Sequence, residues 1–201
     1  MSATGAAIPG GMRIADAQRE MRSAFLGGFV GQLVSAILWL VSGALATALS
    51  PAAGIWFLVI GGVLIFPLTR VGLRLIGRPG AVSPGNTLYA LGAQVAFVLP
   101  LCLPIVGAAA LYRLEWFYPA FMVALGAHYL PFTFLYGMRM FAALAAILWA
   151  AGILLATQLD LGFSAGAWLT GLVLLVFAAS GRARVLREER TGAATGGAAP
   201  V

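Results

Sequence analysis

"AFLGGFVGQLVSAILWLVSGALAT", residues 24–47, decides the fold, because no ionisable side chain interrupts it. The hydrocarbon core of a bilayer takes about 20 apolar residues as a helix. Lipid offers the backbone no hydrogen bonds, so a spanning segment must pair its own amide groups, as a helix does. The stretch therefore predicts a transmembrane helix. A cleaved signal peptide ending at "ALATALS" (44–50) is the competing interpretation, although signal peptides have shorter apolar cores of about 7–15 residues.

Five more apolar stretches follow, each long enough to span a bilayer. They cover about residues 54–76, 88–111, 116–137, 140–159 and 163–181. The chain is 62% hydrophobic and only 9% charged, whereas an ordinary soluble domain carries about 25% charged residues. So few charges cannot cover a water-facing surface. We expect an all-α, polytopic bundle of six transmembrane helices, with the lipid bilayer as its main solvent.

The twelve arginines predict the orientation of this bundle. Eleven fall on one side of the predicted spans, and only Arg113, beside Glu115, falls on the other. Because positive residues are retained in the cytoplasm, both termini should be cytoplasmic, in a bacterial inner membrane. The arginines lie at segment ends instead of in one patch, so nucleic acid is not an expected partner. The eleven are Arg13, Arg19, Arg22, Arg70, Arg74, Arg78, Arg139, Arg182, Arg184, Arg187 and Arg190.

These boundaries divide the chain into three parts. Residues 1–23 form a cytoplasmic N-terminal segment, residues 24–181 the transmembrane domain, and residues 182–201 a flexible cytoplasmic tail. Residues 13–23 fit either an amphipathic surface helix, with Ile14 and Met21 toward lipid, or a solvated positive anchor.

A weak internal repeat also runs through the transmembrane part. "AILW" occurs at 36–39 and again at 146–149, and the same shift aligns "LAT" at 45–47 with 155–157. Transporter repeats are often only weakly visible, so the chain fits three related hairpins. Chance matches in a chain drawn from few residue types are the alternative.

A few polar side chains fall inside the predicted spans, where polarity is costly and points to function. Counted from the cytoplasmic ends, Gln32 lies about 12 Å deep, Gln94 about 9 Å and His128 about 13 Å, at 1.5 Å per residue. Thr69 approaches the same level, and Tyr129 adjoins His128. If these faces converge, they form a small polar cavity in the cytoplasmic half.

Each of these residues also has a structural interpretation. His128 either hydrogen-bonds Gln94 or a free carbonyl across helices, or serves as a proton relay or ligand group, since histidine titrates near neutral pH. Gln32 and Gln94 can equally act as hydrogen bonds between helices. Both interpretations stay open at the level of sequence.

Glycines spaced at four residues predict where helices approach closely. Gly27 and Gly31 precede Ser35 at this spacing, and Gly162 and Gly166 precede Thr170. Small residues at such positions let two backbones come together in a membrane. We therefore expect these glycines to be helix-packing positions.

The residue inventory excludes several kinds of chemistry. One histidine and the single Cys102 cannot form a metal cluster. The sequence offers no Ser–His–Asp set, phosphate loop or dinucleotide fingerprint. No acidic residue falls inside the six spans, which argues against a strongly coupled cation transporter. We expect no cofactor and no enzymatic activity.

At "WFYPAFMVALGAHYLPFTFLYGM" (116–138), the chain resembles an uncharacterised family of small multi-pass bacterial integral membrane proteins. "DAQREMRSAFLGGFVGQLVSAILWL" and "FPLTRVGLRLIGRP" carry the same resemblance, which covers about residues 13–150. It implies a multi-pass membrane protein and supplies no activity or substrate. The last two spans do not add to it.

Two functional hypotheses follow, and a third has less support. The first is a passive or weakly coupled carrier or channel for a small neutral or weakly charged solute, using the polar layer around His128. The second is a non-catalytic scaffold or stress-response protein that packs with a partner, or with a second copy, through its glycine faces. The third is a lipid-modifying enzyme, which lacks recognisable catalytic groups.

Overall fold

The computed structural model describes residues 11–196, and the chain in this range is built of helices joined by turns and loops. Five of its helical stretches are long and apolar enough to cross a membrane: Ile14–Ala48, Pro51–Leu75, Leu88–Tyr112, Met140–Thr157 and Ala165–Gly192. The prediction of an all-α, polytopic bundle is thereby confirmed. The helices are α1 (Ile14–Phe25), η1 (Leu26–Gly28), α2 (Phe29–Ala48), α3 (Pro51–Leu75), α4 (Leu88–Ala96), α5 (Val98–Tyr112), η2 (Leu114–Trp116), α6 (Phe117–Tyr129), α7 (Phe132–Leu135), α8 (Met140–Thr157) and α9 (Ala165–Gly196).

The structure interrupts two of the predicted spans, and the one at 116–137 is not among the five long apolar stretches. Its first part is α6, which ends at Tyr129, and the short α7 follows Pro131. Proline has no N–H, and its ring collides with the carbonyl four residues earlier, so the helical hydrogen bonds fail here. The span at 88–111 is broken in the same way at Phe97, three residues before Pro100. Both breaks lie beside the cavity described below.

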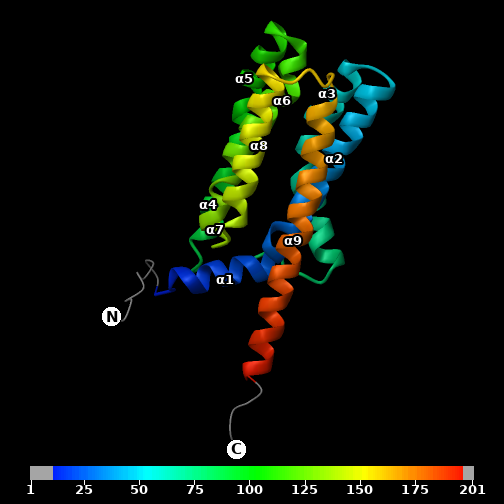
Figure 1. Cartoon of the computed structure of the whole chain (residues 1–201). Coiled ribbons are helices and arrows are strands. Elements are labelled where there is room, and N and C mark those ends of the chain that lie inside the picture. Colours follow the sequence, from blue (N-terminus) through cyan, green and yellow to red (C-terminus); the bar gives the residue numbers. More distant parts are fainter. Residues whose placement is uncertain (1–10, 197–201) are drawn as a thin grey trace, which may run out of the picture.

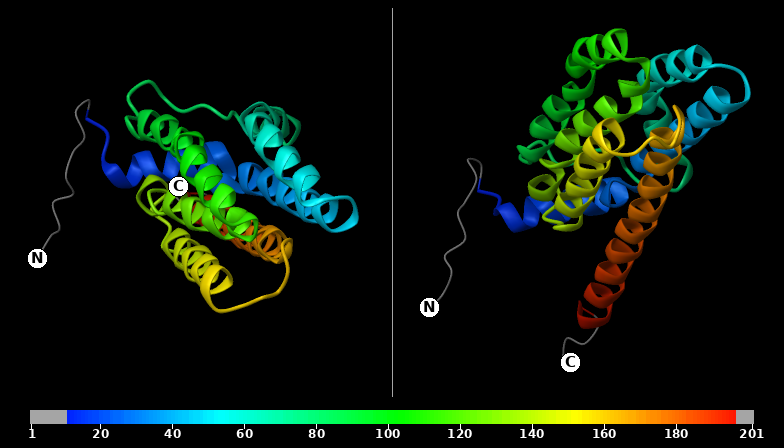
Figure 2. Two further views of the ribbon diagram at one scale, coloured as in Figure 1. Left: turned by 90° about the horizontal axis from the view of Figure 1, so that it is seen from above. Right: turned by 45° about the horizontal axis from the view of Figure 1, so that its top comes forward.

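The long helices assemble into two halves (Figure 1). In one half, α2 packs along both α3 and α9; in the other, α6 packs along both α8 and α5. Figure 2 shows α3 well separated from α4 and α5 when the bundle is viewed along its axis. The expected three related hairpins are therefore not equivalent in packing, because α8 and α9 pack mainly in different halves.

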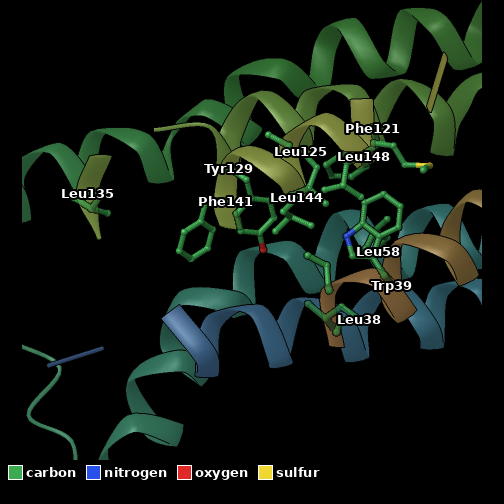
Figure 3. Close-up of a cluster of buried hydrophobic side chains, with 14 of the residues drawn as sticks. Leu38, Trp39, Leu58, Phe121, Leu125, Tyr129, Leu135, Phe141, Leu144 and Leu148 are labelled. Atoms are coloured by element: carbon green, nitrogen blue, oxygen red, sulfur yellow. The ribbon is translucent and has the colours of Figure 1, made fainter. Parts of the chain in front are cut away.

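Aromatic side chains join the halves toward the end that carries the turn at 49–50. Trp39 of α2 contacts Tyr118 and Phe121 of α6, with ring centroids 5.9 and 5.2 Å apart. The Ser42 hydroxyl lies 2.6 Å from the Tyr118 hydroxyl and donates to the Gly54 carbonyl at 2.8 Å. Figure 3 shows Trp39 and Phe121 between the two groups of helices.

The opposite end is closed by α1, which lies across the bundle (Figure 1). Residues 14–23 thus form part of a helix, as the first of the two interpretations predicts. However, Met21 is buried against the protein instead of facing lipid, together with Ala17 and Ala24. Between α1 and α2 the backbone turns through three residues with positive φ, Leu26, Gly27 and Gly28. This left-handed turn redirects the chain from the end of the bundle into its axis.

The predicted flexible tail differs from the structure over most of its length. Helix α9 continues without a break to Gly196, so residues 182–196 are helical, and residues 197–201 lie outside the described range. The continuation is held by ion pairs. Arg22 of α1 pairs with Glu188 at 3.0 Å, and Arg78 pairs with Glu189 at 2.6 Å.

These ion pairs bring three predicted cytoplasmic segments together at one end. Hydrogen bonds from Arg78 hold the pKa of Glu189 below its usual range, and the same bonds raise the pKa of Arg78. Glu20 accepts hydrogen bonds from the Ser83 amide and from Asn86, which lower its pKa. We call Arg22, Arg78, Glu188 and Glu189 the ionic cluster. It ties α1, the loop at 76–87 and α9 to each other.

Candidate functional site

A cavity of about 420 Å³ lies between the two halves, at the end closed by α1. It falls within the range of roughly 300–1,000 Å³ typical of small-molecule sites. Its walls come from α2 and α3 on one side and from α4, α5, α6 and α7 on the other. The wall residues are mostly apolar, as is usual for such sites.

Gln32 is the polar side chain that distinguishes this cavity. It is only 3% exposed, and neither its Nε2 nor its Oε1 has a hydrogen-bond partner within the described structure. The hydroxyl of Thr69 is buried and unpartnered in the same way. Leaving a buried polar group unpaired costs about 1–3 kcal/mol. The cavity thus presents an unpaired donor and an unpaired acceptor to whatever enters it.

Tyr129 supplies the facing wall from the end of α6. Figure 3 shows its hydroxyl directed across the gap toward α2 and α3. That hydroxyl lies near the side chains of Ser35 and Gln32, but its geometry satisfies neither polar atom of the Gln32 carboxamide. Its ring is held by Phe132 and Phe141, at centroid distances of 5.6 and 6.2 Å. The aromatic residues fix the hydroxyl in position.

His128 lies at the cavity wall and is already hydrogen-bonded there. Its Nδ1 lies 3.0 Å from the Val95 carbonyl oxygen, on the neighbouring α4. A carbonyl oxygen only accepts, so Nδ1 carries the proton and Nε2 is left as an acceptor. This bond ties α6 to the break between α4 and α5. Of the two partners that the sequence left open for this hydrogen bond, Gln94 or a carbonyl of a neighbouring helix, the structure shows a carbonyl, that of Val95.

Gln94 differs from the expectation, because it is exposed and lines no part of the cavity. The buried face of α4 carries Leu88 and Val95, seven residues apart. Gln94 is rotated by about 100° from Val95 on a helix of 3.6 residues per turn. The structure thus brings together Gln32, Thr69, His128 and Tyr129, and leaves Gln94 outside.

The four predicted packing glycines fall into different environments. Gly166 approaches α6 closely, since a Cβ there would lie 2.8 Å from the Tyr118 Cβ. Gly31 faces Thr69 at ordinary contact distance and lines the cavity.

The other two predicted packing glycines lie in turns. Gly27 has φ +62° and faces Val185 of α9, so it belongs to the left-handed turn and not to a helix face. Gly162 has φ +80° and faces open space, so a turn requires it and packing does not.

The close contacts between α6 and α8 use glycines that the spacing did not single out. A Cβ on Gly126 of α6 would lie 2.8 Å from the Ala145 carbonyl oxygen of α8. A Cβ on Gly152 of α8 would lie 2.8 Å from the Pro119 carbonyl oxygen of α6. These two contacts are between backbones, so neither partner can move aside. A spacing of four residues does not find such pairs, because each helix contributes only one glycine to its contact.

The two ends of the cavity are closed by apolar side chains. Met21 and Phe25 of α1 lie at the end near the ionic cluster, and Phe25 stacks on Tyr89 at 6.3 Å. Leu58 and Phe121 line the opposite end, below the aromatic contacts of Trp39. The exposed lining residues, such as Val63 and Phe66 of α3 and Pro100 of α5, place the opening at the side, between α3 and the α4–α5 pair.

Residues important to this site that sequence reasoning missed are Ser35, assigned only to packing, and Tyr136, which also lines the cavity. Ser35 follows Gln32 by three residues, so both lie on one face of the helix, and this spacing could have identified Ser35 from the sequence. Tyr136 follows the break at Pro131, so helical periodicity could not place it.

Comparison with curated proteins and with solved structures gives no match. A family model matches residues 14–182, which extends the sequence resemblance through the last two spans. The match takes in α1, the whole cavity and the spanning part of α9. The chain therefore belongs to DUF7010, a family of unknown function.

Proposed function

We propose that this membrane protein is a passive or weakly coupled carrier that binds one small uncharged solute between its two halves. The observation that carries the proposal is Gln32, buried at the cavity wall with its carboxamide unpaired. A solute with one donor and one acceptor would pair both groups and recover the cost of burying them. The proposal is non-enzymatic and assigns the protein to a bacterial inner membrane, with both termini cytoplasmic.

The lining favours an uncharged solute. None of its described residues is Asp, Glu, Lys or Arg. A charged solute would lose its hydration without finding an opposite charge, which is costly in an apolar site. Ion-coupled pumps use acidic groups inside the membrane, and the cavity walls offer none. Weak or absent coupling fits this lining best.

The aromatic layer favours a carrier over an open channel. Trp39, Tyr118 and Phe121 fill the space between the halves above the cavity. A channel needs a continuous path, whereas a carrier holds its solute in a site that is closed on one side. Separation of the two halves at this layer would expose the cavity to the opposite face.

Two outward-facing glycines favour a second candidate, the scaffold that packs with a partner or with a second copy. Gly107 of α5 and Gly62 of α3 both face open space, Gly62 at the mouth of the cavity. Small residues on a lipid-facing helix permit close approach of another helix. Gly126 and Gly166, in contrast, are already used for contacts inside the chain.

Uptake into proteoliposomes tests the carrier proposal. The probes are radiolabelled glycerol, methyl glucoside and hexyl glucoside at tracer concentration, with gluconate as the charged comparison. We expect at least one uncharged probe to enter several-fold faster than into protein-free vesicles, because the cavity replaces its lost hydration. Gluconate should enter no faster.

Two matched variants control this assay. Gln32→Leu removes the carboxamide inside the cavity, and Gln94→Leu makes the same change on the exposed face of α4. Uptake should fall to the protein-free level with the first and persist with the second. Equal effects of the two variants, or no uptake above the protein-free level, would contradict the proposal.

A further inference from the structure

We propose that the solute is an amphiphile, with one apolar chain and an uncharged hydrogen-bonding head, that enters the cavity sideways from the lipid. This inference rests on the proposed function and names the class of its substrate. It places the head at Gln32 and Thr69 and the chain along the opening between α3 and α4–α5.

The opening itself supports entry from lipid. Extensive packing joins α3 to α2 but not to α4 or α5 within the described structure. Val63 and Phe66 of α3 line the cavity and are also 76% and 61% exposed. On the other side, Ala96 and Pro100 both line the cavity and face outward. At this level the surroundings of the chain are hydrocarbon, so the opening leads into the bilayer.

The closed end supports the same route. Met21 and Phe25 of α1 cover the cavity where it approaches the cytoplasmic surface. The ionic cluster holds α1 against α9 at that end. A solute dissolved in the cytoplasm would have to displace this helix. A solute in the inner leaflet would meet no such barrier.

The distribution of polar groups defines the head. Gln32 offers a carboxamide with an unpaired donor and acceptor, and Thr69 an unpaired hydroxyl. Tyr129 adds a hydroxyl from the facing wall. An alcohol, amide or glycerol head can both donate and accept, so it matches this set. A sulfonate or ammonium head would be buried without an opposite charge.

Photolabelling in vesicles tests the inference. The full-length protein is reconstituted in phosphatidylcholine and phosphatidylglycerol with one of three diazirine-bearing probes of equal chain length. The probes are a monoacylglycerol, an alkyl sulfonate and an alkane, which offer an uncharged head, a charged head and no head. Labelled peptides are mapped by mass spectrometry.

We expect the monoacylglycerol to label residues 62–69 and 93–103 about tenfold more than either comparison probe. Hydrogen bonds between its head and the Gln32 carboxamide would strengthen binding by about that factor. Gln32→Leu should lower this labelling to the alkane level. Gln94→Leu should leave it unchanged. Thr69→Val serves as a second variant and should also lower labelling, which keeps the test valid if one substitution disturbs folding.

Three results would overturn the inference. Equal labelling by all three probes means that lipid chains fill the opening without recognition. Equal labelling by the sulfonate means that the head need not be uncharged. Crosslinks between α3 of one copy and α5 of another, with no probe labelling, mean that a second copy covers the opening.

The uptake test of the proposed function and the photolabelling test of this inference can fail independently of each other. Labelling that depends on the head, without uptake, means that the protein binds an amphiphile but does not carry it. Uptake without labelling dependent on the head means that the carrier loads its solute from water.

Discussion

The buried polar residues named above are of two kinds, those whose polar atoms have hydrogen-bond partners and those whose polar atoms have none. At one end, Ser42 and Tyr118 are buried and paired with each other, and Ser42 also donates to the Gly54 carbonyl. At the other end, Gln32 and Thr69 are buried and unpaired. A fully paired group stabilises the fold, whereas an unpaired one destabilises it. The first set therefore joins the halves, and the second is available to a ligand.

This difference predicts that Gln32→Leu makes the protein more stable while abolishing uptake. Leucine removes two unpaired polar groups from an apolar wall, each of which costs about 1–3 kcal/mol. Thermal unfolding in detergent should therefore show a higher midpoint for Gln32→Leu than for the natural protein. Gln94→Leu is the control and should shift the midpoint little. A lower midpoint for Gln32→Leu would mean that its carboxamide is paired in the native state.

At the scale of elements, α6 is short but holds its half of the bundle together. Helix α6 packs between α5 and α8, and buries eight residues along its length. Its contact with α8 depends on Gly126 and Gly152, whose missing side chains let each helix meet a carbonyl oxygen of the other. In lipid, where burial of apolar surface does not drive helices together, such close backbone approach is a main source of association.

Gly126→Ala should therefore destabilise the protein. The added methyl would lie 2.8 Å from the Ala145 carbonyl oxygen, and overpacking of this kind costs about 1–3 kcal/mol. Gly107→Ala in α5 is the matched control, because Gly107 has open space around it. That change should be neutral or stabilising, since alanine is favoured over glycine in a helix by about 1 kcal/mol. Thermal unfolding of both variants in detergent measures the difference, and a similar loss in both would refute the packing argument.

The whole molecule is two helical halves joined by aromatic contacts at one end and bridged by α1 and the ionic cluster at the other. Between these two connections lies the cavity. At the sideways opening, α3 has no extensive packing against α4 or α5 within the described structure. Any relative movement of the halves would be concentrated there.

The ionic cluster makes stability depend on pH. Because the pKa of Glu189 is lowered in the folded protein, Glu189 stabilises the fold above the usual carboxylate range, and this contribution is lost as the pH falls through the folded value. Glu20, with its lowered pKa, acts in the same direction. The Glu189 contribution should not exceed about 1 kcal/mol, since both members of its ion pair are partly exposed to salt and water.

Thermal unfolding in detergent between pH 7 and pH 3 checks this dependence. Glu189→Gln should reduce the fall in midpoint on acidification, and Arg78→Gln should do the same, because either change removes the pair. High salt should bring the natural protein closer to both variants at pH 7. An unchanged pH profile in Glu189→Gln would show that the pair adds nothing to stability.

Sequence reasoning placed the spans well and the site incompletely. Gln32, Thr69, His128 and Tyr129 were predicted to share one layer, and all four line the cavity. Depth along a helix follows from residue number, so the layer could be predicted. Rotation about the helix axis depends on which neighbouring helices each face meets, and residue number does not give it. For that reason Gln94 was expected in the cavity and faces outward.

The sequence by itself determined that this chain forms apolar helices long enough to cross a membrane, because stretches of about 20 apolar residues suit lipid as the solvent and pair their backbone groups as helices. Only the tertiary structure decided that α8 and α9 belong to different halves, that α1 closes one end, and that an unpaired glutamine faces a sideways opening. The physical reason is that the hydrophobic pattern is satisfied by lipid on every face of a helix. Which faces meet depends instead on close contacts between particular glycines, aromatic rings and backbone carbonyls.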